Sequence, residues 1–189
     1  MINRELYMEQ ITPFIDKPFV KVITGIRRCG KSVVLRLIRE ELLRRGVSED
    51  HIIYMNFESF EWMDVKEAKA LYTYIREVTK VSGKYYILLD EIQEVTDWEK
   101  AVNAFLVDLD ADIYVTGSNS RLLSSEFSTY LAGRYVAFHI MTLSFREYLL
   151  FHNVPLAISA SDRKAEFLKY LRMGGFPAIH TANYDYNAI

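Results

Sequence analysis

The chain has 189 residues and a formal net charge of −2, with 50% apolar, 25% charged and 14% aromatic residues. This composition excludes a disordered chain, and the charge gives no general attraction for nucleic acid or for a membrane surface. No apolar run approaches the roughly 20 residues that span a bilayer. Because the single cysteine cannot form an internal disulfide and the first ten residues lack a signal-peptide core, we expect a cytoplasmic protein.

Strands and helices are predicted to alternate along the chain. Five segments rich in β-branched and aromatic residues predict strands over 19–24, 51–57, 84–91, 112–118 and 135–143. Apolar residues at helical spacing predict helices over 31–45, 65–78, 98–109 and 120–132, followed by one after 144 and one that includes 167–171. This alternation favours a parallel sheet covered by helices on both faces, with ligands at the carboxyl ends of the strands.

Three of these helices have predicted capping residues at their starts. Asp64 with Glu67 and Ser144 with Glu147 have the spacing of capping boxes, and Asp97 is placed to cap the helix that follows it.

The segment GIRRCGKS at 25–32 lies between the first strand and the first helix, and it fits the pattern G-x-x-x-x-G-K-[ST]. Such a loop aims backbone N–H groups at phosphate oxygens, while the helix start and Lys31 add positive charge. Ser32 can offer its hydroxyl to Mg²⁺. The alternative is a glycine turn with an exposed lysine. The predicted phosphate-binding residues are Gly25, Ile26, Arg27, Arg28, Cys29, Gly30, Lys31, Ser32 and Val33.

The third predicted strand, in YYILLDEIQ, ends in Asp90 and Glu91. Its almost wholly apolar character is typical of a strand covered on both faces. An aspartate that organises a metal and a glutamate that activates water are needed together with a phosphate loop. The alternative is a solvated acidic strand end, but the order of strand, loop, helix and acidic strand favours a nucleotide site.

The motifs resemble those of the AAA+ superfamily of P-loop ATPases, and in particular a prokaryotic group with GxRRxGKS, LDEIQ, TGSxS, L(A/S)GRY and LSFxEY in this order. The corresponding segments are 25–32, 88–93, 116–120, 131–135 and 143–148. This resemblance implies a three-layer α/β/α fold with a parallel sheet of order 5-1-4-3-2. It also implies a nucleotide-binding core over 1–143 and a helical lid over 144–189. Because relatives continue into a larger lid and a further domain, we expect this lid to be truncated.

The resemblance assigns further roles to single residues. Asn119 would sense the γ-phosphate or position the attacking water, with a turn residue as the alternative. Arg134 would be an arginine finger acting on a neighbouring subunit in a homo-oligomer, or else a surface arginine paired with Glu126 or Asp112. Pro177 would contact the base, with simple helix termination by the glycines before it as the alternative.

The resemblance suggests roles for two more residues, and two local features of the sequence have alternative interpretations. By the same resemblance Asn56 would hold the catalytic glutamate inactive, or be a turn residue, and Arg4 would line the far side of the base. The arginines over 36–45 alternate with glutamates and favour a solvated helix face, with a nucleic-acid groove, which the charge does not indicate, as the alternative. Cys29 is either a filler or a thiol whose pKa is lowered by the lysine and the helix start beside it.

The sequence therefore predicts a Mg²⁺-dependent ATPase. In this hypothesis Lys31 and the loop hold ATP, Ser32 and Asp90 organise the metal, and Glu91 activates water. The alternative is a nucleotide-dependent switch or scaffold that hydrolyses ATP only with a partner, an oligomer or a further domain. The sequence identifies no protein client.

Overall fold

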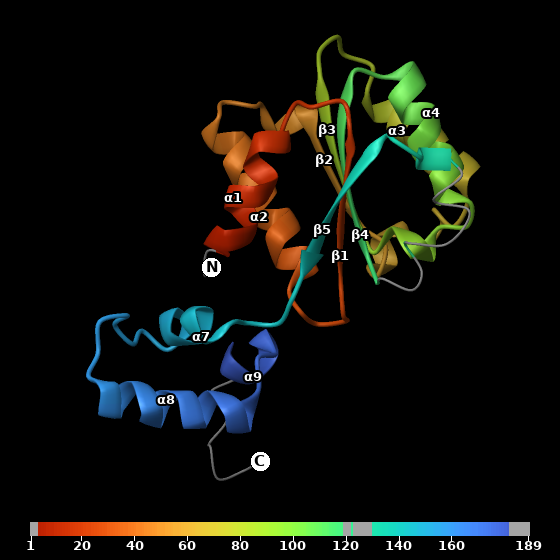
Figure 1. Cartoon of the computed structure of the whole chain (residues 1–189). Helices are drawn as coiled ribbons and strands as arrows, with labels where there is room; N and C mark the ends of the chain where they lie inside the picture. Colours follow the sequence, from red (N-terminus) through yellow and green to blue (C-terminus); the bar gives the residue numbers. More distant parts are fainter. Residues whose placement is uncertain (1–3, 119–121, 123–129, 182–189) are drawn as a thin grey trace.

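The computed structural model describes residues 4–118, 122 and 130–181, and its centre is a parallel sheet of five strands (Figure 1). The strands are β1 (Val20–Gly25), β2 (Ile52–Asn56), β3 (Tyr85–Asp90), β4 (Ala111–Gly117) and β5 (Tyr135–Ile140). Their spatial order is β2-β3-β4-β1-β5. Counted from the other edge this is 5-1-4-3-2, so the predicted order and fold class are confirmed.

The register brings the functional strand ends to one edge of the sheet. Gly25 at the end of β1 pairs with Ile140 at the end of β5, and Asn56 pairs with Asp90. β4 lies between β1 and β3, so one strand separates β1, which leads into the loop at 25–32, from β3, which ends at Asp90. Because all pairs are parallel, every strand delivers its carboxyl end to the same side.

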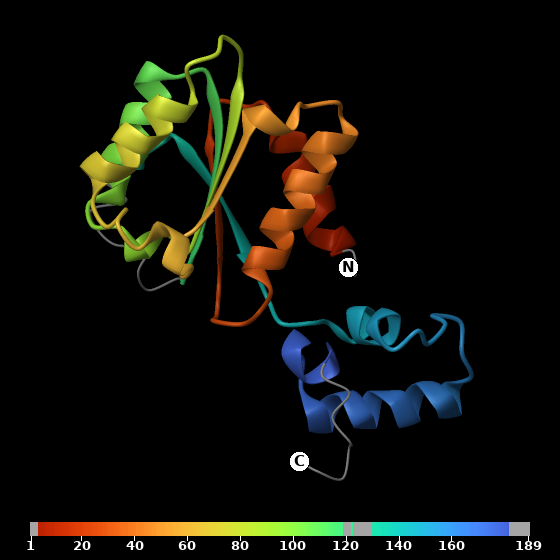
Figure 2. The ribbon, with the colours of Figure 1, turned by 180° about the vertical axis from the view of Figure 1, so that it is seen from behind.

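Helices cover both faces of the sheet, with α1 and α2 on one face and α3 and α4 on the other (Figures 1 and 2). Their bounds are α1 (Glu5–Ile11), α2 (Lys31–Arg44), α3 (Ala68–Val78) and α4 (Trp98–Asp108). Short 3-10 turns cover Thr12–Phe14, Glu49–His51, Phe60–Trp62 and Ile92–Glu94. None of the helices that the structure describes is long and apolar enough to cross a membrane.

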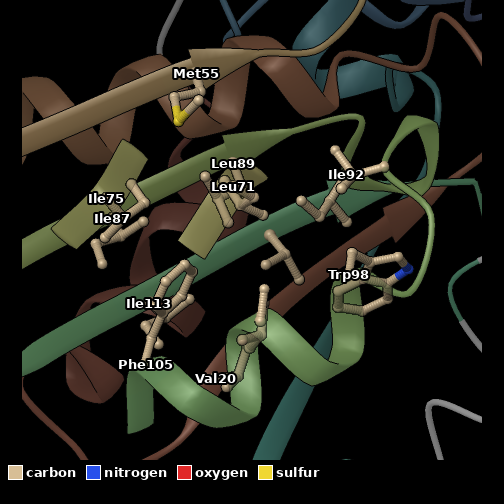
Figure 3. Close-up of a cluster of buried hydrophobic side chains, with 14 of the residues drawn as sticks. Val20, Met55, Leu71, Ile75, Ile87, Leu89, Ile92, Trp98, Phe105 and Ile113 are labelled. Atoms are coloured by element: carbon tan, nitrogen blue, oxygen red, sulfur yellow. The ribbon is translucent and has the colours of Figure 1, made fainter. Parts of the chain in front are cut away.

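The core consists of two apolar clusters separated by the sheet. Successive residues of β3 point to opposite faces, so Ile87 and Leu89 join the cluster under α3 and α4 while Tyr86 and Leu88 join the one under α1 and α2. Figure 3 shows the first cluster, in which Phe105 and other side chains of the helices meet the strands. Burial on both faces explains why β3 is almost continuously apolar.

A further group of helices lies beyond the end of the sheet at which β1 leads into the phosphate loop (Figures 1 and 2). It comprises α7 (Phe145–Phe151), α8 (Ala160–Met173) and α9 (Pro177–Thr181). The Leu143 carbonyl accepts from Tyr170 Oη at 2.8 Å, and the Leu143 amide donates to Gly175 O at 2.7 Å. These bonds join the segment after β5 to α8 and to the approach to α9. The boundary between 143 and 144 stays a prediction.

Of the two predicted capping boxes, the structure confirms one and contradicts the other. The capping box at Ser144 and Glu147 is confirmed, with both reciprocal bonds present. The one at Asp64 and Glu67 is wrong, because α3 begins only at Ala68 and Glu67 makes no side-chain cap. A short parallel bridge between Glu67 and Thr96 holds the preceding backbone extended.

Two other predicted features differ from the structure or fall outside it. Asp97 occupies the N-cap position of α4, but its carboxylate pairs with Lys100 instead of bonding the backbone. The predicted helix over 120–132 falls mostly outside the described residues. α1 was not predicted from the sequence.

Candidate functional site

The turn from β1 into α2 forms a tight loop, and steric contacts explain why two of its positions are glycine. Gly25 has φ +152°, and a Cβ there would lie 2.3 Å from the Ile140 carbonyl oxygen. Gly30 has φ +105° at the start of α2, and a Cβ there would lie 3.1 Å from Nη1 of Arg4. Both positions therefore favour glycine. The loop between them leaves the first N–H groups of α2 without intrahelical acceptors, as an anion site requires.

The loop forms one wall of a cavity of about 800 Å³, a volume within the usual range for small-molecule sites. The side chains around it include four cationic and two anionic groups, so the described lining has an excess of positive charge. The lining residues are Arg4, Arg27, Arg28, Gly30, Lys31, Ser32, Val33, Glu58, Glu91, Phe151, Pro177, Ala178 and Thr181. An apolar wall from α7 and α9 thus faces a cationic loop.

Lys31 and Glu91 meet at the floor of this cavity. The Nζ atom of Lys31 lies 3.2 Å from Oε1 of Glu91, and the lysine side chain is only 3% exposed. Nζ also donates to the Ile26 carbonyl oxygen, at 3.5 Å. A phosphate entering the cavity would compete with the glutamate for this ammonium group.

Asp90, the residue before Glu91 in the chain, is fully buried, and two hydroxyl groups hold its carboxylate. Thr116 Oγ1 donates to Oδ1 at 2.5 Å and Tyr54 Oη donates to Oδ2 at 3.0 Å. Burial, and then the nearby Asp90 charge, raise the pKa of Tyr54, so its phenol stays a donor. Thr116 also accepts from the Glu91 amide at 2.9 Å and so connects the two acidic residues.

Sequence reasoning missed Tyr54 and Thr116 as site residues. Thr116 opens the TGSNS segment and could have been found there, whereas Tyr54 lies in a strand without a motif. It also missed Glu58, Phe151 and Thr181, which reach the cavity from three separate segments.

Not every predicted loop residue reaches the cavity. Arg27, Arg28, Gly30, Lys31, Ser32 and Val33 line it, whereas Gly25 and Cys29 are buried beneath the loop and Ile26 is exposed outside. The prediction of a lowered thiol pKa is wrong, because burial raises the pKa of Cys29 against smaller opposite effects, chiefly from Lys31. Cys29 is part of the apolar cluster under α1 and α2.

Arg4 and Pro177 reach the same cavity from opposite ends of the chain. Pro177 Cγ would lie 3.9 Å from a Cβ on Gly30. Arg4 is 2% exposed and donates to Glu147 Oε1 at 2.5 Å, Cys29 O at 2.9 Å and Met141 O at 2.9 Å. A single guanidinium group thus joins α1, the phosphate loop and the segment from β5 to α7.

Three other predicted residues do not line the cavity or cannot be placed. Arg134 lies at the amino end of β5 and donates to Asn103 at 3.1 Å, while Asp112, its suggested partner, instead binds Lys21. Asn56 accepts from the Glu58 amide at 3.0 Å, which is turn chemistry. Asn119, like the other suggested partner of Arg134 at position 126, lies outside the described residues.

Ser32 and Asp90 offer the oxygen ligands that Mg²⁺ prefers. Ser32 lies in the first turn of α2, and the carboxylate of Asp90 ends β3. Its two hydroxyl partners fix this carboxylate while leaving lone pairs on both oxygens. The residues therefore fit a magnesium site that water and phosphate oxygens would complete.

A parallel sheet with a glycine loop between β1 and α2, and an acidic pair one strand away, defines a P-loop nucleotide-binding fold. Residues 17–149 match the family described as "AAA domain". The chain belongs to this family, and hence to the AAA+ superfamily of P-loop ATPases.

Relatives in two distant organisms resemble nearly the whole chain. An uncharacterised protein of Haemophilus influenzae is 45% identical over 184 residues, which are 97% of this chain and 46% of that protein. One of Methanocaldococcus jannaschii is 35% identical over 184 residues, covering 95% of this chain and 39% of that protein. The chain therefore spans less than half the length of both relatives.

Solved structures support the fold. The RuvB Holliday junction branch migration motor of Thermotoga maritima matches with a TM-score of 0.56 and 14% identity, over 96% of this chain and 60% of that chain. AMPPCP-bound DnaA of Aquifex aeolicus matches with a TM-score of 0.59 and 14% identity, over 96% and 61%. At this identity the likeness concerns the fold alone.

Proposed function

We propose that the protein is a Mg²⁺-dependent ATPase that couples ATP binding and hydrolysis to movement of α7–α9. The observation that carries this proposal is the single cavity in which the phosphate loop, Lys31, Glu91 and Pro177 meet. Its apolar side, from Phe151 and Pro177, suits a nucleobase, and its cationic side suits phosphates. A cytoplasmic location is part of the same proposal.

Each residue at the floor of the cavity has a role in this mechanism. Lys31 and the loop amides bind the β- and γ-phosphates, and a unit charge pair about 4 Å apart is worth roughly 4 kcal/mol at an effective dielectric near 20, before desolvation. Ser32 and Asp90 would hold Mg²⁺, which would supply charge neutralisation on the phosphates.

Glu91 is the proposed base for hydrolysis. The water oxygen bonds to the γ-phosphorus while the bond to the bridging oxygen breaks, giving ADP and inorganic phosphate, and Glu91 accepts the proton of the water. Binding of phosphate to Lys31 would release the carboxylate for this task, since the two side chains pair at 3.2 Å.

The position of α9 supports a lid role for the segment predicted over 144–189. Pro177, Ala178 and Thr181 of α9 line the cavity opposite the loop. A nucleotide between the loop and α9 would contact both the core over 1–143 and the helices that follow the core. Release of the nucleotide would therefore free α9 from the core. Such differential contact is what a coupled conformational change requires.

Arg134 is proposed to act only on a second copy of the chain. It stands at the amino end of β5, a strand of six residues, so about 20 Å of strand separates it from the cavity edge. A finger at this position cannot reach its own nucleotide but is free to reach a neighbour's in a homo-oligomer. Asn119 is proposed as the γ-phosphate sensor.

The alternative function is a switch that binds ATP without turnover. The contact between Lys31 and Glu91 favours it, because a glutamate held by an ion pair is not free to accept a proton. A partner, an oligomer or further domains would then be needed to separate the two side chains.

Calorimetry with Mg²⁺-ATP on the wild type, Lys31→Ala and Lys69→Ala tests the binding site first. Lys69 is an exposed lysine on α3 and serves as the matched control. We expect binding by the wild type and the control, and loss of binding in Lys31→Ala. Absence of binding by the wild type would refute both functions for this chain.

Phosphate release by Glu91→Gln then separates the ATPase from the switch. General-base catalysis contributes roughly 10²- to 10⁴-fold, so turnover should fall by that order while ATP affinity survives. A wild type that binds ATP but releases no phosphate favours the switch, and an unchanged rate in Glu91→Gln removes Glu91 as the base.

A further inference from the structure

Gln93 is a polar residue close to Asp90 and Glu91, and the proposed mechanism assigns it no role. It lies in the 3-10 turn Ile92–Glu94, and its Nε2 donates to Oε2 of Glu91 at 2.6 Å. Lys31 contacts the other oxygen, Oε1. The two oxygens of the glutamate therefore have different partners.

The backbone of Glu91 is also held in place. Its φ is +54°, in the left-handed region, and its amide donates to Thr116 Oγ1 at 2.9 Å. The Glu91 carbonyl accepts from the Glu94 amide at 3.1 Å. With the backbone held in this turn, the remaining freedom of Glu91 is rotation of its side chain, and the Gln93 amide restricts that rotation.

The other end of the Gln93 amide is anomalous. Its Oε1 is buried, and among the residues that the structure describes no donor lies within hydrogen-bonding reach of it. Reversing the amide would place Oε1 against the Glu91 carboxylate, so the repulsion between acceptors fixes the orientation. A buried acceptor without a donor costs stability and is expected only where something else requires it.

Gly117 shows how the sequence accommodates this amide. A Cβ on Gly117 would lie 2.0 Å from Oε1 of Gln93, so a side chain at this position would force the Gln93 amide to move. The glycine of the TGSNS segment thus leaves the room in which the amide lies against the end of β4. Two separate motifs, LDEIQ and TGSNS, meet at this contact.

We propose that Gln93 is the positioning residue of the catalytic glutamate, anchoring Oε2 so that Oε1 alone accepts the proton from water. When Lys31 turns to the γ-phosphate, Oε1 becomes free while Oε2 stays bonded to the amide. The bond from the Gln93 amide to Oε2 then keeps the carboxylate in the orientation that it has in the ion pair with Lys31. This inference rests on the proposed function, in which Glu91 is the base.

The deciding variant is Gln93→Met, which keeps the length of the side chain and removes both the donor and the acceptor for which the described residues offer no partner. A positioning role predicts that kcat falls by roughly 10- to 100-fold, as expected when a reacting group is misplaced by about 1 Å. The ATP dissociation constant should stay within about twofold, and the urea unfolding midpoint should stay equal or rise, because the variant removes a buried oxygen that has no donor among the described residues. Gln10→Met, at an exposed position of α1, is the matched control and should change nothing.

Gln93→Glu gives a second comparison of nearly identical shape. It replaces the donor with a carboxylate against Glu91, so kcat should fall at least as far as in Gln93→Met, and the unfolding midpoint should fall as well. A purely structural role of Gln93 predicts instead that Gln93→Met loses stability and ATP affinity together with rate. That pattern would overturn the inference.

A measurement without catalysis checks the contact itself. The side-chain amide signals of Gln93 in a ¹⁵N NMR spectrum, identified by their absence in Gln93→Met, should shift in Glu91→Gln and stay unchanged in Gln10→Met. Signals unaffected by Glu91→Gln would overturn the contact.

The failures of the two proposals differ. If Glu91→Gln keeps the wild-type rate, or the wild type releases no phosphate, the proposed base fails and the role of Gln93 fails with it. If Glu91→Gln is inactive while Gln93→Met keeps the wild-type rate, only the inference about Gln93 is wrong.

Discussion

Replacing Arg4 by methionine should destabilise the protein far more than its position near the chain start suggests. The guanidinium group is 2% exposed and bonds Glu147 as well as the carbonyl oxygens of Cys29 and Met141. Methionine fills similar space but leaves the Glu147 carboxylate without its cation. Removal of one partner of a buried ion pair typically costs about 3 to 5 kcal/mol.

The structure places the expected cost near the lower end of that range. Glu147 keeps two bonds in its capping box, from the Ser144 amide at 2.8 Å and from Ser144 Oγ at 2.9 Å. The Cys29 carbonyl, in a buried residue, loses a charged donor, whereas Met141 is exposed and water can replace its bond. We expect a loss of about 3 to 4 kcal/mol, or on the order of 10 °C in Tm for a domain of this size.

Urea unfolding followed by tryptophan fluorescence measures this cost, with buried Trp98 as the reporter of the core. Arg44→Met is the matched control, since Arg44 is 74% exposed and pairs with Glu41, so its loss should cost no more than about 1 kcal/mol. Arg4→Lys should fall between the two, because a single ammonium cannot reach three acceptors. If Arg4→Met lowers the free energy of unfolding no more than Arg44→Met does, the bonds of Arg4 to the three segments do not stabilise the protein.

Three further predictions concern buried groups of the core and loop. Lys21→Met should lower the free energy of unfolding, measured in urea, by about 3 to 5 kcal/mol, because it leaves the buried carboxylate of Asp112 without its cation. Adding Asp112→Asn to the same chain should restore part of that loss. Equal stability of the single variant and the wild type would contradict this. Gly25→Ala should weaken ATP binding in calorimetry by at least about tenfold, since the new Cβ would lie 2.3 Å from the Ile140 carbonyl and must displace the loop, and unchanged affinity would show that the loop adapts. Because burial raises the pKa of the Cys29 thiol, less thiolate is present at any given pH, so alkylation at pH 8 should be slower than for a free thiol and accelerate on unfolding in guanidinium; a rate equal to that of glutathione would refute the burial argument.

The fold and the centre of the site could be predicted because their signals are local. Alternating apolar segments predict a parallel sheet with helices on both faces, and the spacing of Gly25, Gly30 and Lys31 between a strand and a helix needs only neighbouring residues, whereas the strand order came from the resemblance to the AAA+ superfamily. Asp90 and Glu91 follow from the end of an apolar strand in the same way. The capping box at Ser144 was predictable because both of its bonds lie within four residues.

Other features depend on contacts between distant segments, and only the tertiary structure decided them. Arg4 and Glu147 lie 143 residues apart in the chain, and Thr116 reaches Asp90 across 26. Only the structure decided between the two alternatives for Cys29, because its burial depends on packing against α1, which carries no motif. Gln93 belongs to a motif and its contact with Glu91 is local, but its close approach to Gly117 follows from the pairing of β3 with β4. Sequence by itself determined which chemical groups stand at the strand ends, whereas their partners, burial and orientation depend on how the strands and helices pack against each other.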